Sequence, residues 1–308
     1  MDGSRRVLAW LVLGGLMLTS GASCPRRRGL QPPIEPVLPP TPTLGQVIDA
    51  VNRNNSQIHD FQTTEATLSG PGFPTLRANL AYERPVRFRM RAESVLGPEL
   101  DLGSNQERFW FWIKRQDPPT VYTCRHDQFA RSPARQSIPV DPAWLVEALG
   151  VAEFDPALPH QGPYPLAGDR LEVRTIRDTP AGPAIKATVV DAAYGWIVEQ
   201  RMYDPQGRLI ARATAEDHRQ DPLSGLIMPS VVKVESPPAQ FSMQIDLGRV
   251  QVNRGFANAA ELWTMPHYEG AALVDLCNPA FTPPPPAPSA ARAPIFARQP
   301  RPPWRGMR

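Results

Sequence analysis

The spacing of hydrophobic residues changes along the chain, and each change predicts a different type of secondary structure. Early in the sequence, apolar residues recur at helical spacing near one face, at Leu44, Val47, Ile48, Val51 and Ile58. Thr43 and Gln46 form a capping-box pair, which places the first turn of this helix. After Phe61 the apolar period shortens to about 2, which is typical of β-strands.

Two of the predicted strands differ in how many of their faces should be buried. In residues 86–93, apolar side chains alternate with Arg87, Arg89, Arg91 and Glu93, so we expect one buried face and one solvated face. Residues 108–113 are apolar on both faces, which predicts a central strand covered on both sides, with residues 121–125 as its hairpin partner. A second short helix is predicted over residues 142–149, and Gly150 is expected to end it.

The remaining strand patterns decide the fold class. Further strands are predicted near residues 170–177, 184–191, 196–203, 208–218, 226–235 and 240–252, with a bulge at Gly248. No alternation of strand and helix occurs, so the sheet should be antiparallel. The predicted fold is mainly β (α+β): a strongly curved, incompletely closed antiparallel β-barrel of about 11 strands, wrapped around two or more short helices.

A curved sheet around helices can leave an apolar cavity between the two layers. If such a cavity exists, apolar residues on the inner face of the strands should line it. The residues expected there are Phe88, Met90, Phe109, Phe111, Trp196, Met243 and Ile245.

Composition separates the flanks from the core. Proline makes up 38 of the 308 residues and is concentrated in residues 25–43 and 279–308, which therefore cannot be helices or central strands. The formal net charge is +3, but the flanks carry ten arginines against Asp2 and Glu35. The core is therefore mildly acidic, which argues against a nucleic-acid partner.

The N-terminal sequence has the organisation of a secretory signal peptide. Arg5 and Arg6 precede the apolar residues 7–18, and small residues then lead to Cys24. Residues 21–24 are similar to a bacterial lipobox, so we expect residues 1–23 to be removed and Cys24 to be acylated. An ordinary cleavage site in front of a cysteine is the alternative. Residues 25–43 would then form a Pro/Arg-rich linker that holds the domain away from a membrane.

Three local motifs resemble the LolA/LolB-type lipoprotein carriers and receptors. The first is Tyr82-Glu83-Arg84-Pro85-Val86-Arg87-Phe88, the second is Val95-Leu96-Gly97-Pro98, and the third is Asp101-Leu102-Gly103-Ser104-Asn105, which leads into Phe109-Trp110-Phe111. The resemblance covers residues 44–252. It leaves residues 253–278 as a C-terminal extension and residues 279–308 as a Pro/Arg-rich tail, which is expected to be disordered.

The resemblance implies roles for three residues. Arg84 matches the arginine that holds a helical lid over the cavity of the carrier, although a strand-end arginine can also simply extend to water. Leu96, with Val95, matches the receptor hairpin that projects into membrane or cargo. Packing of these two residues against the edge of the sheet is the alternative.

The sequence offers little catalytic or metal-binding chemistry. The five histidines are scattered, so we expect no metal site and no cofactor. No hydrolase, phosphate-loop or dinucleotide motif is present, so an enzyme is not expected, although a hydrolase hidden in the cavity is a third possibility. Cys124 and Cys277 could form a disulfide in an oxidising compartment, or Cys124 could be a small apolar strand residue.

These observations lead to one functional hypothesis and one alternative. We expect a monomeric, lipid-anchored envelope protein on the periplasmic side, more in keeping with the outer membrane than with the cytoplasmic membrane. It would bind acyl chains or lipoproteins in its cavity and assist lipoprotein sorting to the outer membrane. The alternative is a module of the same fold that senses envelope stress, or serves a structural role, through a protein partner.

Overall fold

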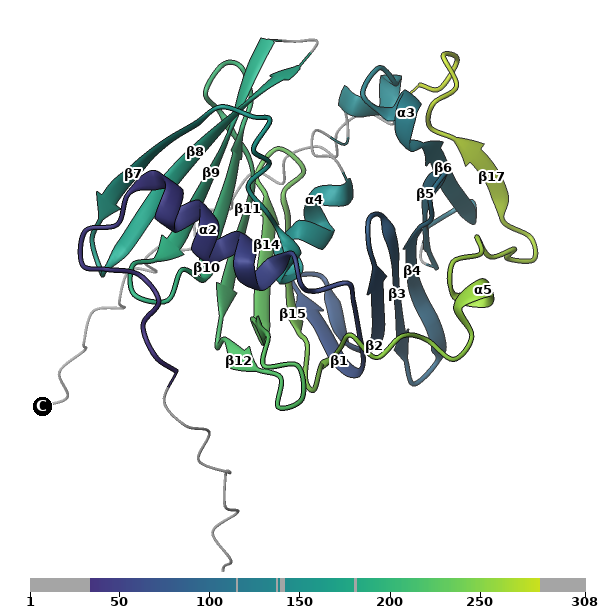
Figure 1. Cartoon of the computed structure of the whole chain (residues 1–308). Coiled ribbons are helices and arrows are strands. Elements are labelled where there is room, and N and C mark those ends of the chain that lie inside the picture. Colours follow the sequence, from purple (N-terminus) through teal and green to yellow (C-terminus); the bar gives the residue numbers. More distant parts are fainter. Residues whose placement is uncertain (1–33, 115, 137, 139–141, 180–181, 283–308) are drawn as a thin grey trace, which may run out of the picture. The chain divides into compact units, whose positions relative to one another are not determined.

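A computed structural model describes residues 34–282, except for residues 115, 137, 139–141 and 180–181 (Figure 1). The predicted signal peptide, Cys24, residues 25–33 of the linker and residues 283–308 of the tail lie outside the described residues. The chain divides into two compact units, Met1–Pro36 and Val37–Arg308. The description below concerns the second unit.

One large sheet dominates this unit (Figure 1). Within the described residues it has 15 strands, 14 of which follow one another as neighbours. In spatial order these are β17 (Ala272–Asp275), β6 (Thr120–Arg125), β5 (Arg108–Ile113), β4 (Gly97–Ser104), β3 (Arg87–Ser94), β2 (Phe73–Glu83), β1 (Asp60–Gly70), β15 (Phe241–Asp246), β14 (Val231–Ser236), β11 (Leu209–Glu216), β10 (Ile197–Tyr203), β9 (Gly182–Asp191), β8 (Arg170–Thr179) and β7 (His160–Leu166). β16 (Gln251–Val252) pairs with β1, and β12 (Arg219–Gln220) forms a separate pair with β13 (Ile227–Met228).

The prediction of about 11 antiparallel strands is wrong in two respects. The described residues contain 17 strands, partly because the predicted strands 226–235 and 240–252 are each divided in two. At the second division β15 and β16 both pair with β1 in the same register, with Asp246 opposite Thr67 and Gln251 opposite Gln62, so the pairing is interrupted without the extra residue of the predicted bulge at Gly248. Gly248 has a φ of +60°, and a Cβ there would lie 2.6 Å from the Glu65 carbonyl oxygen. The sheet is also mixed, because β17 pairs parallel to β6.

The helices are short and few in the described residues. They are α2 (Leu44–Asn55), α3 (His126–Phe129), α4 (Pro142–Val146), α5 (Ala259–Leu262), the 3-10 turn η1 (Pro133–Gln136) and the π-turn η2 (Glu147–Val151). The predicted capping box is confirmed, because Thr43 N–H donates to Gln46 Oε1 at 2.8 Å and Gln46 N–H donates to Thr43 Oγ1 at 3.3 Å. Gly150, which was predicted to end the second helix, lies inside η2 with a non-helical φ of +111°, and the element ends one residue later at Val151.

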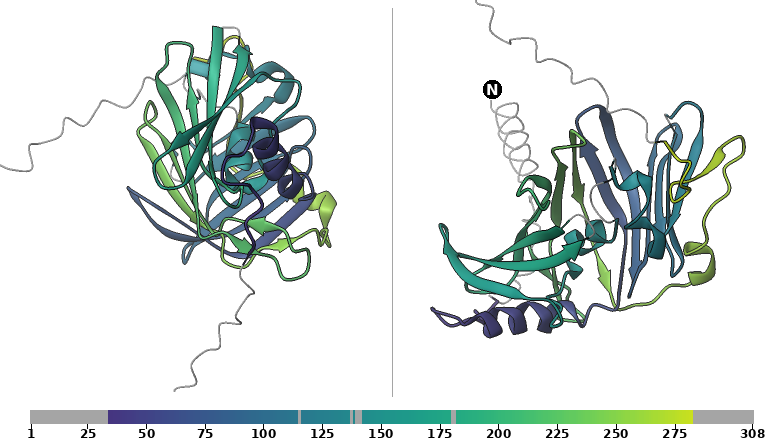
Figure 2. Two further views of the ribbon diagram at one scale, coloured as in Figure 1. Left: turned by 60° about the vertical axis from the view of Figure 1, so that its left-hand side comes forward. Right: turned by 90° about the horizontal axis from the view of Figure 1, so that it is seen from above.

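The sheet curves around the helices. Figure 2 shows α4 inside this curve, and α4 and η2 together pack on the apolar inner face of the strands. The cluster there contains Leu68, Leu80, Met90, Leu149 and Ile245, each of which is at most 2% exposed. α2 packs on another part of the sheet through Val47 and Val51, against Val173 and Val190. Two separate apolar clusters therefore hold the helices on the sheet.

The outer face of β3 to β6 is covered by the C-terminal segment. Trp110, Trp112 and Val121 pack there against Met265, Tyr268 and Ala271, and the rings of Trp112 and Tyr268 stack with centroids 4.1 Å apart. The prediction that residues 108–113 are covered on both sides is confirmed for the outer side and for Phe109 on the inner side, which is 4% exposed, whereas Ile113 on the inner side is 41% exposed.

The expectation of a solvated face on β3 is wrong for Arg89, which is 1% exposed. Arg89 Nη2 donates to Asp101 Oδ2 at 2.6 Å, and Arg89 Nη1 donates to the Thr264 carbonyl at 2.8 Å. Tyr268 OH donates to the same Asp101 oxygen at 2.6 Å. The C-terminal segment therefore supplies partners that make burial of this arginine possible.

A disulfide joins Cys124 on β6 to Cys277, with their Cα atoms 5.3 Å apart. Of the two possibilities for Cys124, a disulfide cysteine or a small apolar strand residue, the structure shows the disulfide. The disulfide and the pairing of β17 with β6 together fix the C-terminal segment on the sheet.

Candidate functional site

Two neighbouring cavities lie on the inner side of the sheet, and α4 forms a wall of both. We call them the apolar cavity and the polar cavity. The apolar cavity has a volume of about 510 Å³ and the polar cavity a volume of about 540 Å³. Four residues line both cavities: Leu102, Ile138, Pro142 and Leu145.

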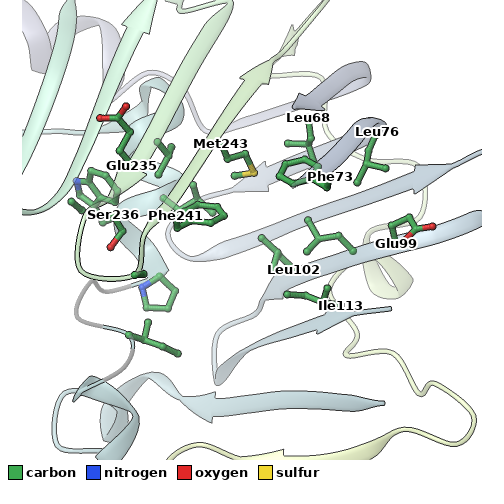
Figure 3. A pocket seen from close by; sticks show the side chains of 18 of the residues that line it. Leu68, Phe73, Leu76, Glu99, Leu102, Ile113, Glu235, Ser236, Phe241 and Met243 are labelled. Atoms are coloured by element: carbon green, nitrogen blue, oxygen red, sulfur yellow. The ribbon is translucent and has the colours of Figure 1, made fainter. Parts of the chain in front are cut away.

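The apolar cavity is built from three parts of the sheet and from α4 (Figure 3). Successive side chains of a strand point to opposite faces of the sheet, and the inward-facing residues of these strands supply most of the cavity surface. Its lining comprises Leu68, Phe73, Pro74 and Leu76 from β1 and β2, Glu99, Leu100, Leu102 and Ile113 from β4 and β5, Ile138, Pro142, Trp144 and Leu145 from the α4 region, and Ala211, Val234, Glu235, Ser236, Ala239, Phe241 and Met243 from β11, β14, β15 and the turn between the last two.

The apolar cavity opens to solvent at one end. Phe241 and Ile113 in its wall are 43% and 41% exposed, whereas Met243 deeper in the lining is 6% exposed. The carboxylate of Glu99 is already partnered, because it accepts from Ser94 Oγ at 2.8 Å and from Lys114 Nζ at 3.4 Å. An open cavity with so few polar groups suits the hydrocarbon part of a ligand.

The polar cavity differs in the charged side chains around it. Its lining includes Arg84, Glu147, Glu153, Asp155 and Arg177, together with His126 and Ser104. Aromatic rings from Tyr82, Phe88, Phe109 and Phe111 contribute to its apolar part. Burial raises the pKa of the Tyr82 phenol above its usual value, although nearby Arg84 acts in the opposite direction.

Arg84 binds the last residue of α2 and the segment that follows it. Its Nε donates to the Ile58 carbonyl at 2.6 Å, and its Nη2 donates to the Asn55 carbonyl at 2.5 Å. Nη2 also pairs with Glu153 Oε1 at 2.6 Å. The carbonyls at a helix C-terminus lack helical partners and carry the negative end of the helix dipole, so a guanidinium is well suited to this position.

A buried ion pair stands behind the polar cavity. Lys186 on β9 is 4% exposed and donates to Glu147 Oε2 on η2. Burial lowers the pKa of the Lys186 ammonium, while Glu147 opposes this change by stabilising the charged form. Glu147 also lies 3.8 Å from Arg177, so one carboxylate connects two cations at this wall.

Ser104 and His126 lie close together in the polar cavity but are not arranged as a nucleophile and a base. Ser104 Oγ is 3.2 Å from His126 Nε2, and the same nitrogen is 2.9 Å from the Asn105 carbonyl oxygen. A carbonyl can only accept, so this contact requires a proton on Nε2. Nε2 then cannot take the proton from Ser104, which argues against the hydrolase alternative at this position.

The residues predicted to line a cavity are distributed over several places. Phe88, Phe109 and Phe111 line the polar cavity, and Met243 lines the apolar cavity. Met90 and Ile245 are 0% exposed in the core beside them and line neither cavity. Trp196 lies elsewhere, with its ring stacked 4.5 Å from Tyr194 and 5.1 Å from His218.

The hairpin tip between β3 and β4 is fully open to solvent. Val95 is 102% exposed and Leu96 is 82% exposed. The Leu96 carbonyl accepts from Lys114 Nζ at 3.2 Å, which places a cation beside this apolar tip. Neither side chain packs against the edge of the sheet.

Several lining residues were not found from the sequence. Leu68, Phe73 and Leu76 line the apolar cavity from β1 and β2, and their strand periodicity after Phe61 was the available signal. Glu147 and Lys186 gave no such signal, because only the fold brings β9 to η2.

Within the described residues, no cluster of histidine, cysteine, aspartate or glutamate could hold a metal ion. No helix of the described part of the chain combines the length and the apolar character needed to cross a bilayer.

No protein-family model matches the chain, and no curated protein matches it. Among solved structures, the chain is similar to a domain named for outer membrane lipoprotein sorting from Vibrio parahaemolyticus, with 12% identity, coverage of 70% of this chain and 98% of that one, and a TM-score of 0.47. It is also similar to a DUF1329 family protein from Desulfovibrio piger, with 12% identity, coverage of 73% and 97%, and a TM-score of 0.45. A LolA superfamily protein from Nitrosomonas europaea shows 11% identity, coverage of 73% and 99%, and a TM-score of 0.45. Two of these three structures are named as a lipoprotein-sorting domain and as a LolA superfamily protein.

Proposed function

We propose that this protein binds an amphiphile that carries an acyl chain, such as a lipid or an acylated protein. The observation that supports this is the apolar cavity of about 510 Å³, which is lined almost entirely by hydrocarbon and aromatic side chains and opens between Phe241 and Ile113. Apolar surface in such a site gains free energy when it leaves water, by about 0.8 kcal/mol for each CH₂ group.

The polar cavity extends this proposal to the rest of the ligand. It shares a wall with the apolar cavity and carries both arginines and carboxylates, among them Arg84 and Glu153. The polar end of an amphiphile would lie on this side, while its chain enters the apolar side. α2 would act as the lid at this end, held by the contacts of Arg84 to the Asn55 and Ile58 carbonyls.

The protein is proposed to work in an oxidising compartment outside the cytoplasm. The Cys124–Cys277 disulfide supports this, because structural disulfides persist in the periplasm and are rare in the cytosol. The proposed acyl anchor at Cys24 and the exposed Val95–Leu96 tip would place it at a membrane surface. Assistance in sorting lipoproteins to the outer membrane is the role that fits this combination.

A chain-length series tests the proposal. Purified protein is titrated with single-chain lipids of increasing length, and displacement of an apolar fluorescent probe is measured. Affinity should rise about fourfold for each added CH₂ until the cavity is filled. Absence of saturable binding, or equal affinity at all lengths, would contradict the proposal.

Two tryptophan variants locate the binding in the apolar cavity. Leu100 lines only the apolar cavity, so Leu100→Trp should fill it and lower probe affinity by at least about tenfold. The matched control is Leu223→Trp, because Leu223 is 73% exposed and lines neither cavity. Equal loss in both variants would show that binding takes place elsewhere.

A further inference from the structure

The C-terminal segment leaves the described fold at a fixed point. Cys277 is joined to Cys124, and Leu276 N–H donates to the Thr123 carbonyl at 2.8 Å. Phe281 N–H then donates to the Asn278 carbonyl at 2.9 Å. These contacts anchor the chain just before residue 283, where the Pro/Arg-rich tail continues.

This exit point borders the cavities. Phe281 packs against a cluster formed by Phe109, Cys124, Phe129, Ala134 and Leu276. Ile138 packs against the same cluster and also lines both cavities. The tail therefore begins beside the wall that the two cavities share.

The mouth of the apolar cavity is within reach of this point. Ile113 at the mouth is on the same strand as Phe109, four residues along β5, or about 14 Å away at the rise of a strand. Ile295 lies 13 residues after Thr282, and an extended proline-rich chain of that length spans about 40 Å. The length of the tail thus allows Ile295 to reach the cavity.

The tail sequence also matches the cavity in character. Residues 283–308 are rich in proline and arginine, and Ile295 and Phe296 form an adjacent pair of large apolar residues within them. Arg292 and Arg298 stand on either side of this pair. At the cavity, Glu235 presents an exposed carboxylate in the lining. The sequence of an apolar pair between two cations is therefore complementary to an apolar cavity that has a carboxylate in its lining.

We propose that Ile295 and Phe296 of the same chain occupy the apolar cavity when no lipid is present. The tail then acts as a tethered competitor, because its attachment at residue 282 gives it a high effective concentration at the cavity mouth. A lipid must displace the tail in order to bind. This inference rests on the proposed binding function, which the tail would regulate.

Probe binding by the full chain tests the competition. The double variant Ile295→Ser/Phe296→Ser should bind the apolar probe about tenfold more tightly than the original sequence. The matched control is Trp304→Ser, which removes an aromatic residue from the same tail and should leave the affinity unchanged. Equal affinity in the original protein and the double variant would overturn the inference while leaving the binding function intact.

Crosslinking tests the location of the tail without any ligand. Phe296 is replaced by benzoylphenylalanine in the full chain, and the photoproducts are mapped by mass spectrometry. The inference expects crosslinks within one chain to cavity residues such as Phe73 or Leu100. Crosslinks between chains, crosslinks outside the cavity, or none at all would overturn it. Because this readout needs no probe, it remains decisive even if the protein binds no lipid.

Discussion

The apolar cavity and the polar cavity have similar volumes and share a wall at α4, but they are built from different interactions. The apolar cavity is surrounded by side chains whose burial alone stabilises the fold. The polar cavity is surrounded by charges that must be paired, such as Arg84 with Glu153 and Lys186 with Glu147. The same sheet therefore supports one surface suited to hydrocarbon and one suited to polar groups.

The largest expected effect comes from breaking the ion pair at the polar cavity. Glu147→Gln leaves the Lys186 ammonium buried without its carboxylate, so the free energy of unfolding should fall by about 3–5 kcal/mol. Urea denaturation at pH 7 measures this change. The control is the double variant Glu147→Leu/Lys186→Met, which removes both charges and should lose less. A loss below about 1 kcal/mol in the single variant would show that the pair is solvated in solution.

An intermediate effect separates the lining of the apolar cavity from the core beside it. Met90 is 0% exposed and lines neither cavity, whereas Met243 lines the apolar cavity. Met90→Ala should therefore create a new void and lower the free energy of unfolding by about 2–5 kcal/mol. Met243→Ala should lower it by an amount near the bottom of that range, because one side of the Met243 side chain already faces the cavity.

Probe binding checks the same pair of variants. Met243→Ala should alter the affinity for an apolar probe, because it changes the cavity surface, and Met90→Ala should leave it unchanged. If Met90→Ala changed the affinity as much as Met243→Ala, the assignment of Met90 to the core outside the cavity would be contradicted.

The smallest expected effect is a pH dependence at the polar cavity. Burial raises the pKa of Tyr82 in the folded protein above its ordinary value of 10.0. Above pH 10 the unfolded chain loses the phenolic proton while the folded chain keeps it, so the free energy of unfolding should fall as the pH rises. Tyr82→Phe should make this fall shallower between pH 10 and 11 and should change little at pH 7, as measured by urea denaturation. Parallel curves for the two proteins would contradict the expectation.

Features that depend on neighbouring residues could be predicted from the sequence. The capping box needs only Thr43 and Gln46, and it is formed as expected. Gly150 breaks the helical geometry within one residue of the end of η2, because a φ of +111° suits glycine, and this too is visible locally. The alternating pattern of residues 86–93 correctly predicted which side chains of β3 point toward the inner face of the sheet.

Features that depend on distant segments could not be predicted in the same way. Arg89 has the sequence pattern of a solvated arginine, and its burial depends on the Thr264 carbonyl, 175 residues later in the chain. Trp196 is as apolar as the other expected lining residues, but its partners are Tyr194 and His218 rather than a cavity. Strand β17 is only four residues long and pairs parallel to β6, so its short pattern carries little signal.

The open sheet has two terminal strands, β7 and β17, and within the described residues each is paired on one side only. Unpaired strand edges can template association with other chains, so proteins commonly limit the backbone donors they present. β7 contains Pro163 and Pro165, which have no N–H groups, and β17 spans only Ala272–Asp275. Both borders are therefore poor starting points for an added strand, which lets the sheet remain open around its two cavities with a low risk of aggregation.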